Sequence, residues 1–190
     1  MQIFRSDIFC PRQGEPREQI NGLTAFVDGS NIYGSDDETS IGLRADVTVR
    51  VRGGGGRTKT FPGARLKIQT SDGHEALPSR SQCGFASPPN GGNPTQKDLT
   101  SGDTRAVVQP ALTSIHTLFV YEHNRIVDAL LPLWKAHAKT KDLSPHAREE
   151  FIFEVSRVCN LYYLQFSMIY HYICMLKKCV TKFLVSSIFH

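Results

Sequence analysis

The stretch Ser101-Gly102-Asp103-Thr104-Arg105 opens the part of the chain that decides its fold. Leu112-Thr113-Ser114-Ile115-His116-Thr117-Leu118 and Glu122-His123-Asn124-Arg125 follow it closely. Both lie in the strongest helical pattern of the chain, which we predict to run from Thr113 to His137. Pro132 should kink this helix or end its first segment. Apolar residues recur near one face of a 3.6-residue period, namely Ile115, Leu118, Phe119, Ile126, Leu130 and Leu133.

Shorter helices are predicted on both sides of this segment. Glu18 to Phe26 suits a short amphipathic helix, which the turn-forming run Asp28-Gly29-Ser30-Asn31 ends. Ser35 to Leu43 has the pattern of a second helix, with Ser35 as N-cap and Glu38 completing a capping box. A further helix should begin after Ser144, a good N-cap that a proline follows.

Residues 50–96 are dominated by glycine, proline, serine and charged side chains. Such a composition buries little apolar area, so we predict a long irregular loop with one hairpin, formed by Val47 to Val51 and Arg65 to Gln69. The basic residues between Arg50 and Lys67 suggest RNA binding, but Phe61 is the only aromatic residue in that stretch, whereas single-strand binding relies on stacking aromatics. We therefore expect a solvated loop and no nucleic-acid partner.

The formal net charge of +4 belongs to the end of the chain. All 18 acidic residues lie at or before Glu154, and the same part of the chain is electrically balanced by Lys and Arg. The sequence pI of about 8.8 therefore describes the C-terminal residues and does not indicate a polyanion partner. The excess comes from Arg157, Lys177, Lys178 and Lys182.

The stretches quoted above resemble the animal haem peroxidases, the myeloperoxidase, peroxidasin and peroxinectin superfamily, in motif order and spacing. Arg17-Glu18-Gln19-Ile20-Asn21 and Phe26-Val27-Asp28-Gly29-Ser30 extend the resemblance upstream. The resemblance implies a mainly α fold. Residues 1–158 would form an internal part of the all-helical peroxidase domain, loop-rich at about 47–100.

By this resemblance Arg105 is the distal cation, a catalytic and cofactor-binding residue that stabilises charge developing on the peroxide O–O bond. A planar, always-charged guanidinium suits this task better than a lysine. The implied cofactor is haem b. Val108 stands where many members carry a Glu that forms an ester to the haem, and Gln109 where a minority carry a sulfonium-forming Met. We therefore expect any haem to lack that covalent link.

Neither haem histidine of the family has a counterpart in this chain. The resemblance puts the distal histidine upstream of these residues and the proximal one far downstream. His116 and His123 do match family positions, but as helix-packing and hydrogen-bonding residues seven apart on one helical face. This chain alone should therefore lack peroxidase turnover.

The run Thr24-Ala25-Phe26-Val27-Asp28-Gly29-Ser30 resembles the calcium loop of the family. Its implied ligands are the side-chain oxygens of Thr24, Asp28 and Ser30 and the backbone carbonyl of Phe26, the hard oxygens that Ca²⁺ prefers. A further family carboxylate adjoins the distal histidine and is missing, so the site is incomplete. An EF-hand fits less well, because required oxygen-ligand and glycine positions are apolar or aromatic. Without the resemblance, Asp-Gly-Ser reads as an Asx-type turn.

Near Val158 the resemblance stops, and residues 159–190 form a divergent hydrophobic tail without carboxylates. Three interpretations stay open. The loss of family pattern favours non-native translation, while the uncharged residues 158–176 are long enough for a membrane helix. A buried helix is the third. Four polar residues weaken membrane insertion, namely Asn160, Gln165, Ser167 and His171.

The five cysteines are an odd number, which excludes full intramolecular pairing. The resemblance implies that Cys10 and Cys83, the two in the family-like part, either pair or are both free. Family members are typically secreted, which implies an extracellular parent protein. The first residues of this chain nevertheless lack the apolar region of a signal peptide.

The sequence thus predicts part of a peroxidase whose parent reduces hydrogen peroxide and oxidises a halide, a phenol or a protein tyrosine, a chemistry linked to oxidative stress. Its partners would be hydrogen peroxide and small reductants. Two alternatives belong to other classes. One is a non-enzymatic adhesion or matrix module on the same scaffold, and the other is a single-pass membrane fragment anchored through residues 158–176.

Overall fold

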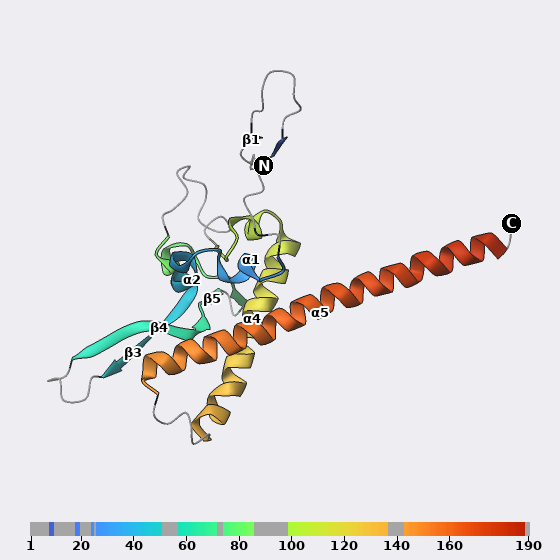
Figure 1. Cartoon of the computed structure of the whole chain (residues 1–190). Coiled ribbons are helices and arrows are strands. Elements are labelled where there is room, and N and C mark those ends of the chain that lie inside the picture. The colour runs from blue at the N-terminus through green and yellow to red at the C-terminus, as the bar shows by residue number, and fades with distance from the viewer. Residues whose placement is uncertain are drawn as a thin grey trace.

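The computed structural model describes residues 8–9, 18–19, 24, 26–50, 57–71, 74–85, 99–136 and 143–188. Two long helices dominate these ranges, accompanied by short helices and antiparallel strand pairs (Figure 1). The mainly α class is confirmed. The helices are α1 (Ser30–Tyr33), α2 (Asp37–Leu43), α4 (Pro110–Ala136), α5 (Pro145–Ile188) and the 3-10 turns η1 (Ser81–Cys83) and η2 (Thr104–Val107). The strands pair as β1 (Ile8–Phe9) with β2 (Glu18–Gln19), β3 (Arg44–Arg50) with β4 (Thr58–Leu66), and β5 (Gln69–Ser71) with β6 (His74–Ala76).

The core lies where α1, α4 and α5 meet the strand β4. Helix α5 crosses α4 and continues well beyond the rest of the molecule, while the β3–β4 hairpin points away on another side (Figure 1). Each large apolar side chain buried here contributes roughly 1.5–3 kcal/mol relative to exposure. The fully buried members include Ile32, Tyr33, Leu77, Val127, Ile152 and Phe153.

The predicted helix from Thr113 to His137 is confirmed as α4, which continues through Pro132, so the proline does not end it. Its predicted apolar face is only partly correct. Phe119 and Leu130 pack against the core and Ile126 is buried. Three other members of that face are exposed in the described structure, namely Ile115, Leu118 and Leu133.

A different row of α4 faces the core, because hydrogen bonds to β4 decide its rotation. Asn124 accepts the N–H of Leu66 at 2.8 Å and donates to the carbonyl oxygen of the same residue at 3.1 Å. Such a paired contact satisfies two backbone groups that would be costly to bury unbonded. Helical spacing then carries His116, Val120 and His123 inward on the same side.

A chain of buried hydrogen bonds joins the elements of the core. His123 Nε2 lies 2.9 Å from the carbonyl oxygen of Ala64, which only accepts, so Nε2 carries the proton. His123 Nδ1 therefore accepts from the Tyr33 hydroxyl at 3.0 Å. Asn160 Nδ2 donates to the Tyr33 oxygen at 2.7 Å and to the carbonyl oxygen of Phe119 at 2.9 Å. One donor–acceptor chain thus ties α5, α1, α4 and β4 together.

The buried charge of Arg44 fastens the β3–β4 hairpin to α5. Its Nε donates to the carbonyl oxygen of Gly63 at 2.6 Å, and its Nη1 lies 2.8 Å from a carboxylate oxygen of Glu150. The guanidinium also stacks 4.1 Å from the ring centroid of Phe153. Pairing of this kind is needed before a buried charge is tolerated.

The hairpin itself corrects the predicted register. β3 begins before the predicted Val47, and it pairs with β4, so that Val47 faces Phe61 rather than residues 65–69. Burial decides this register, because it turns Phe61, Ala64 and Leu66 inward. The stretch expected to be irregular at about 47–100 therefore includes strands, and Leu77 is buried there as well. Residues 86–98 lie outside the described residues.

Two predicted short helices have different outcomes. The helix at Glu18–Phe26 is wrong at its start, where Glu18–Gln19 is a strand, and at Phe26, which is 82% exposed and not helical. A short helix needs packing to persist, and Phe26 has none. The helix ending at Leu43 is confirmed as α2, but Asp36 caps it, through an oxygen that accepts the Thr39 N–H at 2.7 Å. The predicted cap at Ser35 is therefore one residue early.

Helix α5 begins as predicted, with the Ser144 hydroxyl accepting the Ala147 N–H at 3.2 Å. The domain boundary at Val158 stays a prediction, and the helix runs through that residue. Beyond it, Asn160 is buried and Gln165 donates to the carbonyl oxygen of Val27 at 2.8 Å. In the described ranges, no helix combines the length and apolar character required to cross a membrane.

The thiol of Cys83 is buried and free, and burial raises its pKa. Its predicted alternative partner, Cys10, lies outside the described residues.

Protonation of His123 should destabilise the fold. The pKa of His123 is lowered from 6.5 to about 4, chiefly by burial. The bond to Ala64 opposes this shift, and the nearby Arg44 and Arg65 add to it. The unfolded chain therefore binds more protons below about pH 6.5, and stability is lost as the pH falls toward 4. We expect the free energy of unfolding to drop by up to about 3 kcal/mol over this range, measured by urea denaturation.

Substitution of His123 itself provides the control for this titration. His123→Gln should flatten the pH profile at a lower overall stability. A His123→Gln profile as steep as that of the wild type would contradict the assignment.

Candidate functional site

The two motif regions predicted to carry the chemistry meet through hydrogen bonds to the backbone. The Ser101 hydroxyl donates to the carbonyl oxygen of Asn31 at 2.9 Å. The N–H groups of Gly102 and Asp103 donate to the carbonyl oxygens of Ile32 and Asn31, at 3.2 and 3.1 Å. We call these three bonds the α1 junction. It fixes the segment that leads into Arg105 against the helix that follows the Thr24–Ser30 loop.

Gly102 makes the α1 junction possible because the two backbones approach closely. A Cβ atom added there would overlap the backbone nitrogen of Gly34 and the carbonyl oxygen of Ser30, and it would lie 2.8 Å from the carbonyl carbon of Ile32. All three neighbours are backbone atoms, which cannot turn aside as a flexible side chain can. Glycine is therefore required here by space.

Arg105 lies in η2, and Asp103 holds both its backbone and its side chain. The carboxylate accepts the Arg105 N–H at 2.8 Å, which makes Asp103 the N-cap of η2. It also accepts from Nε at 3.0 and 3.1 Å and from Nη2 at 2.6 Å. The side chain of Arg105 is 50% exposed and that of Asp103 is 14% exposed. These hydrogen bonds raise the pKa of Arg105 and lower the pKa of Asp103, so both groups stay charged at neutral pH.

The two residues that follow η2 stand where family members carry the side chains that attach the haem covalently. Val108 is 53% exposed and Gln109 is also exposed, at the start of α4. Neither side chain carries a carboxylate or a thioether. The predicted absence of a covalent haem link follows from this chemistry and stays a prediction.

The side chains of three histidines are described, and two of them lie buried on α4. Both ring nitrogens of His123 are engaged in the buried hydrogen-bond chain. His116 is buried and donates through Nδ1 to the carbonyl oxygen of Leu112 at 2.9 Å. These two residues have the packing and hydrogen-bonding roles predicted for them. His146 lies on α5 against the ring of Phe61. The side chains of His74 and His171, and all of His137 and His190, lie outside the described structure.

The predicted calcium loop is a chain of local turns that ends at α1. The Phe26 N–H donates to the Thr24 hydroxyl at 3.1 Å, and the Ser30 N–H donates to the Asp28 carboxylate at 3.0 Å. The latter bond lowers the pKa of Asp28, which keeps that carboxylate ionised. Gly29 takes the left-handed backbone conformation, with φ of 71°, that this turn requires. The arrangement is an Asx-type turn whose oxygens lie close together.

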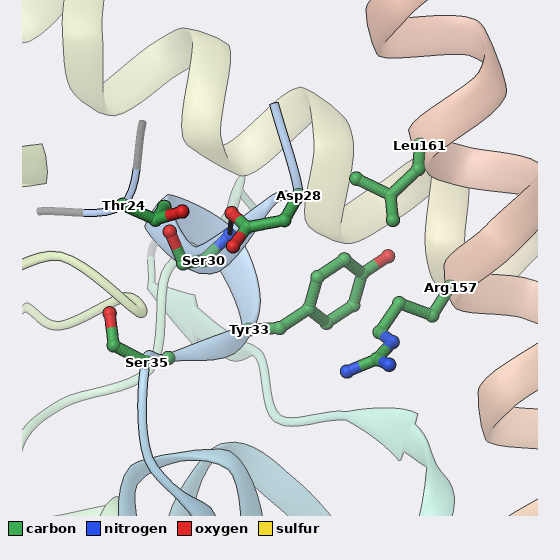
Figure 2. A pocket seen from close by; sticks show the side chains of 8 residues that line it. Thr24, Asp28, Ser30, Tyr33, Ser35, Arg157 and Leu161 are labelled. Atoms are coloured by element: carbon green, nitrogen blue, oxygen red, sulfur yellow. Dashed lines mark hydrogen bonds between the residues drawn. The ribbon is translucent and has the colours of Figure 1, made fainter. Parts of the chain in front are cut away.

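A cavity of about 400 Å³ opens beside this loop. Figure 2 shows Thr24, Asp28 and Ser30 on one side of it, and Arg157 and Leu161 reaching in from α5 on the other, with the ring of Tyr33 between them. Three of the four predicted calcium ligands therefore line one space. The side chain of the fourth, Phe26, is exposed, and its predicted contribution is a backbone carbonyl. Across the described residues, no group of three or more His, Cys, Asp or Glu side chains is placed to hold a metal.

Sequence reasoning missed the contributions of Asp103, Arg157 and Asn160. Asp103 was visible as part of a motif, and its spacing of two residues from Arg105 is the only signal that it pairs with that residue. Both Arg157 and Asn160 come from α5. Arg157 lines the cavity beside the loop and Asn160 bonds to Tyr33, in each case more than 120 residues further along the chain. No local pattern predicts such a contact.

The chain is similar to known proteins in sequence and in fold. A sequence model described as animal haem peroxidase matches residues 1–184, well past Val158. Human thyroid peroxidase is 35% identical over 131 residues, which is 65% of this chain and 13% of that protein. Mouse eosinophil peroxidase is 33% identical over 163 residues, which is 82% of this chain and 19% of that protein. Among solved structures, peroxidase A from Dictyostelium discoideum has a TM-score of 0.55 at 25% identity, over 76% of this chain and 24% of that one.

The chain belongs to the animal haem peroxidase family. It spans less than a quarter of the length of each of these relatives.

Gly102→Ala should disrupt the α1 junction. Overpacking a close backbone contact costs typically 1–3 kcal/mol, so we expect the free energy of unfolding to fall by about that amount. The amide resonances of Ile32 to Gly34 should shift in NMR spectra. Gly42→Ala is the matched control, because its Cβ would meet Cys83 and Phe85 in another part of the fold. Equal effects of the two substitutions on the α1 resonances would contradict the role of Gly102.

Proposed function

We propose that this chain supplies the distal arginine and the calcium loop of a peroxide-reducing haem peroxidase. The α1 junction carries this proposal, because it sets Arg105 and the Thr24–Ser30 loop in one unit of structure. The parent protein would be extracellular and would oxidise a halide, a phenol or a protein tyrosine, with hydrogen peroxide and small reductants as its partners. Response to oxidative stress is the corresponding biological setting.

The chemistry of Arg105 supports the role of distal cation. Asp103 occupies Nε and one side of Nη2, so the remaining N–H groups of the guanidinium are available to an anionic oxygen. A positive donor held at fixed geometry stabilises charge that develops on such an oxygen. Haem b, when a complete domain holds it, supplies the redox chemistry, and neither haem-histidine motif of the family matches the sequence of this chain. We therefore propose that this chain alone has no turnover.

The loop chemistry supports a weak calcium site. Asp28 is ionised, and the hydroxyls of Thr24 and Ser30 share its cavity, which matches the hard-oxygen preference of Ca²⁺. Among the described residues that line this cavity, only Asp28 carries a carboxylate, and Ca²⁺ affinity rises with the number of charged ligands. Arg157 lines the same cavity and adds a positive charge that opposes cation binding. We propose that the loop binds Ca²⁺ in this chain with a dissociation constant of roughly millimolar size.

The isolated chain should not oxidise guaiacol with hydrogen peroxide faster than free haemin does, because neither haem-histidine motif of the family matches its sequence. Haem titration should likewise give no Soret band typical of histidine ligation. Turnover that Arg105→Ala abolishes would show that this chain is an enzyme by itself.

A longer chain that restores the family segments with both haem histidines tests the role of Arg105. Arg105→Lys should slow the reaction with peroxide by about a hundredfold, the usual cost of losing one fixed donor to a developing oxyanion. Arg125→Lys, in the exposed pair with Glu122, is the matched control and should leave the rate unchanged. A restored chain that binds haem but never reacts with peroxide would favour the adhesion or matrix scaffold.

Calcium binding should depend on Asp28. Isothermal titration calorimetry should detect weak binding to the wild-type chain and none to Asp28→Ala, because hydroxyl and carbonyl dipoles alone cannot replace the hydration of a divalent ion. The matched control is Asp37→Ala, an exposed carboxylate at the start of α2. Equal binding by wild type and Asp28→Ala would make the loop a turn and not a cation site.

A further inference from the structure

We propose that Asp103 is a positioning residue, which clamps one edge of the Arg105 guanidinium and so presents the opposite edge as a fixed receptor for an anionic oxygen. This inference rests on the proposed function of Arg105. The carboxylate of Asp103 takes no direct part in the proposed reaction with peroxide, and its role is to hold Arg105.

The bonds to Asp103 use one edge of the guanidinium only. Its carboxylate accepts from Nε at 3.0 and 3.1 Å and from Nη2 at 2.6 Å, which is the side-on arrangement of an arginine–carboxylate pair. The two N–H groups of Nη1 and the second N–H of Nη2 lie along the other edge. Because the guanidinium is planar and rigid, fixing the first edge also fixes the direction of the second.

A clamp is needed because Arg105 is exposed. Half of its side-chain surface faces solvent, so packing alone does not restrict its rotamers. A long, free side chain loses considerable conformational entropy when a ligand orders it, and that loss weakens the interaction. The pair with Asp103 orders the side chain before any ligand arrives.

Asp103 is itself firmly held, which separates this pair from an ordinary surface ion pair. Its carboxylate is only 14% exposed and also caps η2 by accepting the Arg105 N–H at 2.8 Å. Its own N–H donates to the carbonyl oxygen of Asn31, and the neighbouring Gly102 packs against the backbone of α1. The guanidinium is thus positioned relative to the core and not merely to a neighbouring side chain.

The chain contains a matched pair for comparison. Glu122 contacts Arg125 with the same side-on geometry, at 2.8 Å from Nε and 2.6 Å from Nη2, on the outer surface of α4. That arginine is 63% exposed, and its carboxylate does not cap a turn. The two pairs therefore share their chemistry and differ in their anchoring.

Asp103→Asn separates the clamp from the cap. The amide oxygen of asparagine caps a helical turn about as well as aspartate does, so the fold and its thermal midpoint should stay near those of the wild type. The charge that holds the guanidinium is lost. In ¹⁵N-labelled full-length chain, solvent exchange of the Arg105 Nε–H should accelerate by roughly three- to tenfold, as expected for the loss of a charge-assisted hydrogen bond.

Three further variants complete the test. Glu122→Gln should accelerate exchange at Arg125 and leave Arg105 unchanged. Gly102→Ala keeps Asp103 but shifts its anchor, so it should change the Arg105 Nε–H chemical shift. Asp103→Ala removes clamp and cap together and should also lower the thermal midpoint.

Unchanged exchange of the Arg105 Nε–H in Asp103→Asn would overturn the proposal, whatever the haem experiments show. Accelerated exchange supports the clamp even if Arg105→Lys leaves the peroxide reaction of the longer chain intact. In that case the proposed function fails, and Asp103 keeps only a structural role.

Discussion

One chain of buried hydrogen bonds crosses the core of the protein. Asn160 donates to Tyr33, Tyr33 donates to His123, and His123 donates to the carbonyl oxygen of Ala64. The tautomer of His123 follows from that last acceptor, and burial keeps the ring neutral by lowering its pKa to about 4. Burial also raises the pKa of Tyr33, so its hydroxyl stays a donor. A buried chain of hydrogen bonds favours one arrangement, because removing a member leaves its neighbours unsatisfied in a medium of low dielectric. The positions of α1, α4, α5 and β4 all depend on it.

The candidate site inherits its geometry from this core through α1. Tyr33 links the core to the candidate site. Its side chain anchors α1 in the core, and the next residue, Gly34, lies where the backbone of Gly102 approaches α1. At the α1 junction all three acceptors are backbone carbonyl oxygens, and two of the donors are backbone N–H groups. The side chains of α1 can therefore serve the core, while its carbonyl groups hold the motif that carries Arg105. The close approach of the two backbones requires a glycine at position 102.

Patterns within short stretches of sequence correctly predicted those helices whose limits depend on nearby residues. The span of α4, the start of α5 and the existence of α2 follow from apolar periodicity and capping chemistry, and they are confirmed within a few residues. The helix at Glu18–Phe26 was wrong because periodicity does not show whether Phe26 will find a partner to pack against. The rotation of α4 was partly wrong because Asn124 and His123 bond to β4, which leaves Ile115 and Leu118 exposed to solvent. The motif resemblance identified Arg105 and Asp28 as candidate site residues. The approach of Arg157 to the loop depends on where α5 crosses α4, and no short sequence pattern predicts that position.

The exposure of Arg105 limits what this chain achieves alone. A unit charge 4 Å away contributes about 1 kcal/mol in bulk water but about 4 kcal/mol at the effective dielectric constant of about 20 found near protein surfaces. The guanidinium is half exposed, so water screens most of its effect on an anionic oxygen. Orientation and exclusion of water are therefore separate requirements for the proposed role. The first is met within the chain by Asp103 and the α1 junction. The second needs a cover over η2, and in the described structure the neighbouring Val108 and Gln109 lie open to solvent. The activity we propose thus depends on a surface that closes over this turn.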